Sequence, residues 1–486
     1  MSFRRLLIFA FFLLPLAALA QQTAPPPPQQ QQAPDNSQEP FVIEKLIYHV
    51  RFENDGTGIS EATLQIRVQS EAGVQQLGQL VMGYSAANQR IEFGYVRVRK
   101  ADGSVVTAGP EAVQDLSAPL AREAPMYTDL RQKHVTVPAL RPGETLEYNV
   151  KTITEKPLAP GQFWFEYGFE RNAITLFEQL ELNLPGSRVV KTKSKPAFEP
   201  RVSDAAGRRV YTWTSANKKR VSEDETQPKK KSRQEPESAD IQVTTFENWE
   251  QVGQWYGALV KERLQSTPAL HAKATELTRG LSTPLEKLQA IYNYVAVNFR
   301  YVSLSFGAGR YQPHAAEDVL TNQYGDCKDK HTLLAALTQE VGIEVDPALI
   351  PSQRKVDAEV PSPAHFDHVI SVFPLGSDRI WLDTTTEVAP FGMLASGLRN
   401  KSALVIPGNS SARLIKTPAD PPFASTQEVV IEGSINDLGK LDARLRYSLR
   451  GDSELVFRSA FRRTPRKRCS PTSTATARTN TPCWRH

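Results

Sequence analysis

The sequence is poor in cysteine, in net charge and in long apolar runs. Only three cysteines occur among 486 residues, and two of them, Cys469 and Cys483, lie near the C-terminus. A disulfide framework is therefore not expected, although exported proteins can form disulfides. The formal net charge is only +5, which does not indicate a nucleic-acid-binding surface. After residue 20 no apolar run approaches the roughly twenty residues that span a bilayer, so the mature chain is expected to have no transmembrane span.

The N-terminus has the three parts of a secretory signal peptide. Arg4 and Arg5 precede an almost continuous apolar stretch, and Ala18-Leu19-Ala20 forms a small-x-small cleavage site before Gln21. We therefore expect residues 1–20 to be removed and the mature protein to be exported, to the periplasm or out of the cell. A short membrane anchor is the alternative, but about fifteen apolar residues are marginal for spanning a bilayer. Because Gln21 and not a cysteine follows the cut, a lipid-anchored form is not expected.

Residues 41–216 have the pattern of a β-rich domain. Glu61–Val68 largely alternates apolar and polar residues, and Tyr95–Val98 and Leu146–Ile153 do so more loosely. Turn-forming groups such as Asn54-Asp55-Gly56 separate the runs. Several short strands at such intervals are typical of a sandwich, so we expect an N-terminal β-sandwich-like domain.

At about residue 244 the pattern changes to that of an α/β core. Thr283 is a good helix cap, Pro284 suits the first helical position, and apolar residues recur on one helical face after them. These apolar residues are Leu285, Leu288, Ile291, Tyr292, Val295 and Phe299. Two strand-like segments, 368–373 and 379–383, follow further along the chain. The pattern predicts an α/β domain over residues 244–400.

The complete expectation is an α+β multidomain protein with a partial C-terminal β region. Strand-like residues return at about residue 427, but the chain then becomes rich in Arg, Ser and Thr without any periodicity. The expected segments are a signal peptide (1–20), a Gln/Pro-rich disordered tether (21–40), the β-rich domain (41–216), a charged linker (217–243), the core (244–400), a β-rich C-terminal region (401–461), and a tail that is disordered, truncated or frame-shifted (462–486).

A thiol, an imidazole and a carboxylate follow one another in the core as Cys327, His368 and Asp383. Cys327 lies at the start of an apparent helix, where the helix dipole favours a thiolate and free N–H groups can hold an oxyanion. Lys328 and Lys330 are expected to add positive charge nearby. His368 and Asp383 each lie on a strand-like segment, in the order of a nucleophile, its base and the acid that orients the base. The combination predicts a catalytic triad, although each residue alone also fits a structural role.

Other chemistries have less support in the sequence. His365 and His368 are three residues apart, and Cys327 and His331 are four apart, but zinc sites usually need closer clusters of ligands than these. A glycine-rich phosphate loop or dinucleotide fingerprint does not occur. We therefore expect no metal and no cofactor.

Four motifs together resemble the bacterial transglutaminase-like superfamily. They are Arg300-Tyr301-Val302-Ser303, Tyr324-Gly325-Asp326-Cys327-Lys328-Asp329-Lys330, Asp367-His368-Val369-Ile370 and Trp381-Leu382-Asp383. The β-rich part before them is similar to domain of unknown function 3857, which commonly precedes such cores. The resemblance implies a papain-like fold with Cys327 as nucleophile, His368 as base and Asp383 as orienting acid. It also makes Tyr301 a candidate for supporting the oxyanion.

The sequence departs from this family in two places. Asp367 stands where Asn is frequent, and the family normally continues the C-terminal β domain that is only partial here. The chemistry that the resemblance implies is acyl transfer through a thioester. The favoured interpretation is a cysteine peptidase or amidase that acts on peptide or protein amides at the cell envelope. A cross-linking transglutaminase is the alternative, and a non-catalytic envelope scaffold that binds a partner is a third. The sequence indicates no particular oligomeric state.

Overall fold

The computed structural model describes residues 36–463, except 128, 219–238 and 303–310. The expected signal peptide, most of the tether, most of the charged linker and nearly all of the tail lie outside the described residues. Within the described part of the chain, no helix combines the length and the apolar character needed to cross a membrane.

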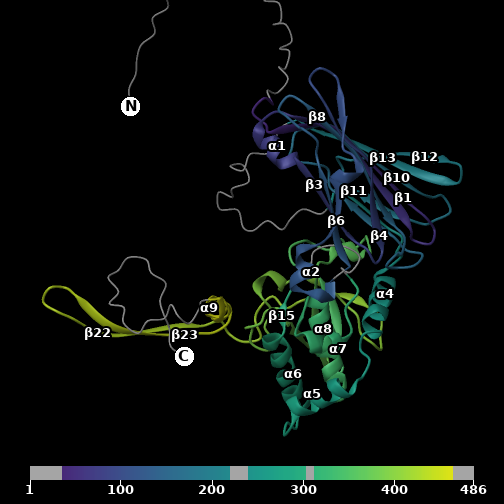
Figure 1. Ribbon diagram of the computed structural model, residues 1–486. Helices are drawn as coiled ribbons and strands as arrows, with labels where there is room; N and C mark the ends of the chain where they lie inside the picture. Colours follow the sequence, from purple (N-terminus) through teal and green to yellow (C-terminus); the bar gives the residue numbers. More distant parts are fainter. Residues whose placement is uncertain (1–35, 128, 219–238, 303–310, 464–486) are drawn as a thin grey trace, which may run out of the picture.

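The N-terminal part is built on one long sheet of eight strands, in the order β12-β13-β10-β1-β2-β8-β4-β5 (Figure 1). All neighbours pair antiparallel except β1 and β10, which are parallel. The strands are β1 (Phe41–Phe52), β2 (Gly58–Val68), β4 (Gln89–Arg99), β5 (Val105–Thr107), β8 (Thr145–Thr154), β10 (Thr175–Pro185), β12 (Arg201–Ala205) and β13 (Arg208–Asn217). The three segments that alternate in the sequence thus fall in β2, β4 and β8.

Two sheets of three strands each pack against the long sheet. One has the order β3-β7-β6 and the other β11-β14-β9. Their strands are β3 (Gln79–Ser85), β6 (Val113–Ser117), β7 (Leu130–Thr136), β9 (Trp164–Tyr167), β11 (Lys191–Ser194) and β14 (Ile241–Thr244). Apolar side chains of both layers fill the space between them. Leu146 of the long sheet is buried in one cluster with Val135 of the first small sheet, and Leu182 in another with Val243 of the second. The short helices of this part are α1 (Glu71–Leu77), α2 (Pro119–Glu123), η1 (Pro110–Ala112) and η2 (Pro125–Tyr127).

Strand β14 corrects one expected boundary. Its residues fall at the end of the expected linker and the start of the expected core, but β14 pairs with β11 and β9 of the β-rich part. The chain therefore returns to the β-rich part before it enters the core. The sequence did not predict this strand, because it follows a charged linker and its partner strands lie far away in the sequence.

The second part combines helices with an antiparallel sheet of five strands, in the order β19-β18-β17-β20-β21. The helices are α4 (Trp249–Lys261), α5 (Pro268–Thr278), α6 (Pro284–Asn298), α7 (Ala316–Asn322) and α8 (Cys327–Gln339), with short turns η4 (Pro363–His365) and η5 (Ser396–Leu398). The strands are β17 (Asp346–Ile350), β18 (His368–Leu375), β19 (Asp378–Leu382), β20 (Ser402–Val405) and β21 (Arg413–Lys416), with the separate pair β15 (Arg300–Tyr301) and β16 (Tyr324–Gly325). Strands β20 and β21 extend this sheet past residue 400, where the core was expected to end.

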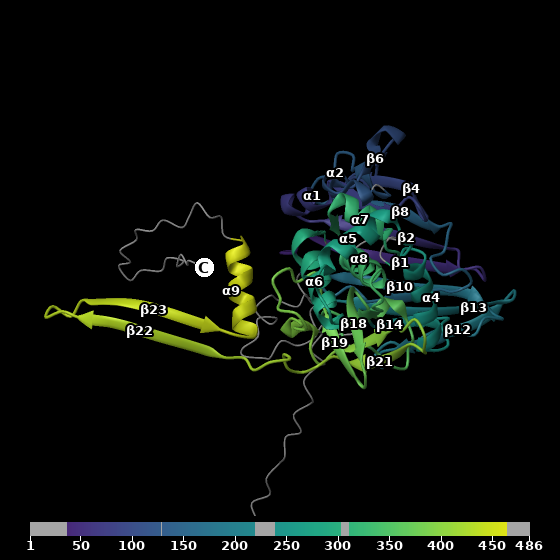
Figure 2. The same ribbon diagram turned by 90° about the horizontal axis from the view of Figure 1, so that it is seen from below.

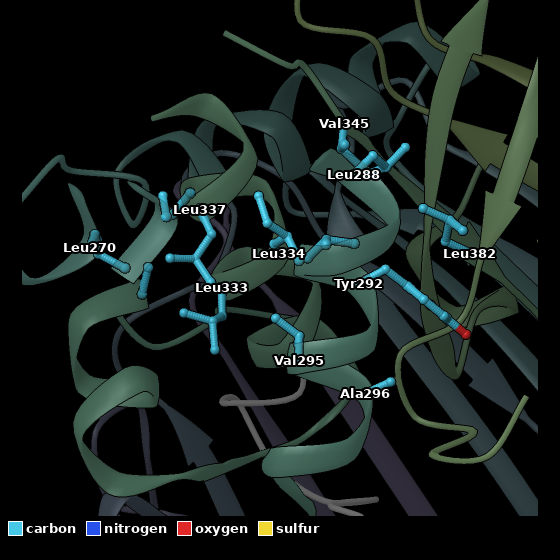
Figure 3. Packing of buried hydrophobic residues seen from close by; sticks show 14 of the residues in the cluster. Leu270, Leu288, Tyr292, Val295, Ala296, Leu333, Leu334, Leu337, Val345 and Leu382 are labelled. Atoms are coloured by element: carbon cyan, nitrogen blue, oxygen red, sulfur yellow. The ribbon is translucent and has the colours of Figure 1, made fainter. Parts of the chain in front are cut away.

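Helix α8 is the centre of the apolar core of this part. Leu333, Leu334 and Leu337 are fully buried against α5 and α6, and Leu382 of β19 closes the cluster (Figure 3). Helix α6 starts as the sequence predicts, with Thr283 as its N-cap and Pro284 as its first residue, and Glu286 completes a capping box with Thr283. This packing gives α8 a fixed position relative to the sheet.

The last described segment adds no strand to the sheets of the other two parts, but it contacts the second part, since Arg399 pairs with Asp452 and Arg462 with Glu387. Strands β22 (Gln427–Ile435) and β23 (Leu441–Leu449) pair only with each other, and helix α9 (Asp452–Arg463) follows them (Figure 2). The hairpin was expected from the sequence, but α9 was not, since it falls across the expected boundary between β region and tail.

Helix α6 offers a direct test of the core. Leu288 is 0% exposed, whereas Leu285, expected on the same buried face, is 41% exposed. Leu288→Ala should lower the free energy of unfolding by about 2–5 kcal/mol, because it leaves a cavity in the core. Leu285→Ala should change it by no more than about 0.5 kcal/mol. Chemical denaturation measures both, and equal losses would contradict the burial described here.

Candidate active site

Cys327 is the first residue of helix α8, and the turn that carries it is strongly capped. The Asp326 carboxylate accepts hydrogen bonds from the backbone N–H groups of Lys328 (3.1 Å) and Asp329 (3.2 Å). The Asp329 carboxylate in turn accepts the N–H of Asp326 at 3.2 Å, which completes a capping box. This arrangement holds the half-buried thiol of Cys327, a free cysteine, at the N-terminus of the helix dipole.

The charged residues around Cys327 are buried. The ammonium group of Lys328 pairs with the Asp326 carboxylate, and both side chains are almost completely buried. Lys330 donates to the carbonyl oxygens of Ala296 (3.1 Å) and Phe299 (2.8 Å) at the end of α6. Burial lowers the pKa of Lys330 to about 8. The two lysines therefore tie α8 into the core. Lys328 also interacts electrostatically with Cys327, and although burial would lower the pKa of Lys328, the carboxylates of Asp326 and Asp329 raise this pKa.

His368 and Asp383 meet because β18 and β19 are neighbours. Ser371 pairs with Leu382, so the same register places Asp383 opposite Ile370, and His368 lies on the same face as Ile370. His368 Nε2 is 3.4 Å from Oδ1 of Asp383. Cys327 is the second group that acts on this imidazole, through a side-chain hydrogen bond and through its charge interaction. The three residues that the sequence singled out thus come together at one place.

Asp383 is held as a buried anion. Its Oδ1 accepts hydrogen bonds from the N–H (2.9 Å) and hydroxyl (2.7 Å) of Thr385, and its Oδ2 accepts the hydroxyl of Thr386 at 2.9 Å. Its backbone carbonyl accepts the Tyr292 hydroxyl at 3.1 Å. Burial alone would raise the pKa of Asp383, but the charge of His368 and the bonds from Thr385 lower that pKa to about 2. The carboxylate is therefore ionised at neutral pH.

The imidazole of His368 is correspondingly easy to protonate. Burial would lower its pKa, but the Asp383 carboxylate, together with Cys327, raises the pKa of His368 well above its ordinary value. A histidine that is protonated next to a thiol and an anion can hold a thiolate–imidazolium pair.

The three residues open onto a cavity of about 670 Å³. Tyr301, on β15, lines this cavity and is half-buried. Tyr256, on α4, also lines it but is 0% exposed. The Tyr256 hydroxyl is buried without a hydrogen-bond partner among the described residues, and this burial raises the pKa of Tyr256 well above its ordinary value. Sequence reasoning missed Tyr256, because an aromatic residue on an amphipathic helix has the pattern of an ordinary core residue.

Two family matches cover the two parts of the chain. Residues 54–222 match the Domain of Unknown Function with a solved structure, DUF3857, and residues 271–348 match the Transglutaminase-like superfamily. The chain carries both domains, in this order. The transglutaminase-like match includes Cys327 but ends before His368 and Asp383, which the sheet brings to the thiol.

Comparison with solved structures agrees with this fold. A crystal structure described as a candidate protease from Parabacteroides distasonis superposes with a TM-score of 0.64 at 16% identity, over 79% of this chain and 72% of that one. An M1 zinc metallopeptidase from Deinococcus radiodurans gives a TM-score of only 0.23 at 11% identity, over 43% of this chain and 42% of that one. No curated protein matches the chain.

The histidines that suggested a metal site have other partners in the transglutaminase-like core. His331 Nδ1 lies 2.8 Å from the Ser371 hydroxyl, and His365 Nε2 lies 2.8 Å from the carbonyl oxygen of Val360. Within the described ranges, no group of three or more His, Cys, Asp or Glu side chains is arranged to hold a metal ion.

The charge of Asp383 should control the titration of His368. In Asp383→Asn the amide no longer favours the imidazolium, so the pKa of His368 should fall and the ring should lose its proton at a lower pH. Histidine NMR titration measures this shift, with His368→Gln to assign the signal. Asp378→Asn, an exposed position at the start of β19, is the matched control and should leave the titration unchanged. An unaltered His368 titration in Asp383→Asn would show that the two groups are not coupled.

Proposed function

We propose that this chain is an exported, cysteine-dependent acyl-transfer enzyme that hydrolyses peptide-like amides. The observation that carries the proposal is one imidazole between the Cys327 thiol, at the start of a helix, and the buried Asp383 carboxylate 3.4 Å away. The proposal includes a papain-like core, since a nucleophile at the N-terminus of a helix faces a base and an acid on an adjacent antiparallel sheet. The candidate-protease description of the superposed structure agrees with amide hydrolysis. The signal-peptide pattern of residues 1–20 supports an activity at the cell envelope.

In the proposed reaction the Cys327 thiol first gives its proton to His368, which leaves a thiolate and an imidazolium. The Cys327 sulfur attacks the amide carbonyl carbon, a C–S bond forms, and the carbonyl oxygen becomes an oxyanion. The His368 imidazolium then donates its proton to the leaving amine as the C–N bond breaks. Water attacks the thioester, His368 takes a proton from this water, and the C–S bond breaks to return the thiolate. Asp383 keeps the ring oriented and stabilises its charged form.

Two groups are placed to stabilise the oxyanion. The cap at Asp326 uses the N–H groups of Lys328 and Asp329 but not the N–H of Cys327 itself, which can point at the developing charge. The Tyr256 hydroxyl is the second donor in this proposal, because it is buried at the cavity and has no hydrogen-bond partner in the part of the chain that the structure describes. It meets the requirement of a preorganised donor better than the half-exposed Tyr301 does.

The proposal predicts a steep order of losses among site variants. Cys327→Ala should abolish hydrolysis of a fluorogenic peptide amide, because no other group can form the thioester, and His368→Ala should be nearly as severe. His49→Ala, at a histidine of β1 that is 44% exposed, is the control and should retain full activity. Product analysis with and without a primary amine separates hydrolysis from cross-linking. Labelling of Cys327 by a thiol-directed electrophile at the same rate in His368→Ala and wild type would favour the non-catalytic scaffold.

Tyr256→Phe separates a catalytic hydroxyl from a structural one. Loss of one oxyanion donor typically costs about 100-fold or more in kcat. Because no described residue bonds to this hydroxyl, its removal should leave the melting temperature unchanged or raise it. Tyr148→Phe, a buried tyrosine of β8 in the DUF3857 domain, is the control for both measurements. Full activity in Tyr256→Phe would remove this residue from the oxyanion site.

A further inference from the structure

A short segment of the DUF3857 domain reaches the start of the catalytic helix. Between β6 and β7 the chain forms α2 and η2, and this segment lies against the transglutaminase-like core at β15 and β16 (Figure 1). Ala124 and Tyr127 from this segment are buried in one apolar cluster with Val302 and Tyr324 of the core. The two domains thus share a small core directly under the turn that carries Cys327.

Tyr127 binds both residues of the capping box of α8. Its hydroxyl donates to Oδ2 of Asp329 at 2.6 Å and accepts the backbone N–H of Asp326 at 2.9 Å. The side chain is 3% exposed, so these bonds are shielded from water and are stronger than exposed ones. Asp326 and Asp329 flank Cys327 on its two sides, and therefore Tyr127 holds the turn on which the thiol sits.

His314 links the same segment to the same carboxylate. Its Nε2 is 3.0 Å from the carbonyl oxygen of Met126, and its Nδ1 is 3.2 Å from Asp329. Both partners are acceptors, so both ring nitrogens must carry protons to serve them. Burial would lower the pKa of His314, but Asp329 raises it above the ordinary value. The His314 ring thus joins Met126 of the DUF3857 domain to the Asp329 carboxylate of the capping box.

Further contacts keep the segment in place. The N–H of Met126 donates to the Tyr324 hydroxyl at 2.8 Å, and Arg300 donates to the carbonyl oxygen of Glu123 at 3.0 Å. The two domains meet at a second place, on the cavity wall, where Arg354 of the core pairs with Glu166 of β9 at 2.6 Å. The DUF3857 domain therefore contacts the core at the cap of α8 and again beside the cavity.

We propose that the DUF3857 domain is a positioning element of the active site, and that Tyr127 acts through Asp326 and Asp329 to set the position of the Cys327 thiol relative to His368. The inference rests on the proposed function of Cys327 as a nucleophile. Without the Tyr127 hydroxyl, the Asp326 N–H loses its shorter bond and Asp329 loses its closest donor. The first turn of α8 would then shift or fray, and a displacement of the nucleophile slows the reaction even when the fold persists. Activity is thereby conditional on the docking of the N-terminal domain.

Tyr127→Phe in the full-length chain tests this proposal, because it removes the hydroxyl and keeps the ring in the shared cluster. We expect the rate of Cys327 alkylation by iodoacetamide, followed against pH, and kcat for peptide amide hydrolysis to fall by about 10-fold, since misplacement of reacting groups by even 1 Å can cost more. KM should change by less than about 2-fold, because no substrate contact is removed. The matched control is Tyr84→Phe, which removes a 2.6 Å bond from a buried tyrosine to Asp115 within the same domain. It should leave both rates unchanged.

The outcomes separate this proposal from its alternatives. A folded Tyr127→Phe variant with wild-type alkylation and hydrolysis rates would overturn it, and so would equal losses in Tyr84→Phe. If Tyr127→Phe does not fold, Tyr324→Phe takes its place, because it removes the bond to Met126 without touching Asp329. A lower alkylation rate in Tyr324→Phe supports the proposal, and an unchanged rate overturns it. If alkylation is unaffected by His368→Ala, the proposed function itself fails, whatever Tyr127→Phe does.

Discussion

The structure around the thiol depends on one buried carboxylate, that of Asp329. It is 0% exposed and accepts hydrogen bonds from the Asp326 N–H, the Tyr127 hydroxyl and the backbone N–H of His314. Burial would raise the pKa of Asp329, but the bond from His314, the charge of Lys328 and the bond from Tyr127 hold this pKa below its ordinary range. A buried charge is costly unless each of its acceptor sites is used. The start of α8, the approach to α7 and the N-terminal domain are therefore all constrained at one point.

The second half of the site is built differently, by a sheet. His368 and Asp383 owe their 3.4 Å separation to the antiparallel pairing of β18 with β19, and the hydroxyl groups of Thr385 and Thr386 saturate the Asp383 carboxylate. Helix α8 packs on this sheet through its apolar residues and through His331, which reaches Ser371 of β18. The thiol and the imidazole thus belong to separate elements, each held rigidly, which is the condition for a preorganised site.

Both the start of α8 and the wall of the cavity contact the N-terminal domain. The contact through Tyr127 acts at the helix, and the Arg354–Glu166 pair acts at the cavity wall. The aromatic side chain of Trp164 on β9 also packs against Trp255 of α4, the helix that carries Tyr256. A domain that is docked at these places can influence the Cys327 thiol, the Tyr256 hydroxyl and access to the cavity.

The amino-acid sequence by itself determined the features that depend on neighbours in the chain. The capping box at Thr283, the helix start at Cys327 and the strands that carry His368 and Asp383 follow from caps, periodicity and turn residues, and the structure agrees with them. Tertiary structure decided the rest. Leu285 is exposed although its periodicity matches the buried face, and β14 pairs with strands far away in the sequence. The burial of the Tyr256 hydroxyl and the bonds of Tyr127 arise only when helix α4 and the N-terminal domain pack in the folded chain. No local pattern encodes such contacts, because the free energy that makes them comes from burying residues separated by many tens of positions.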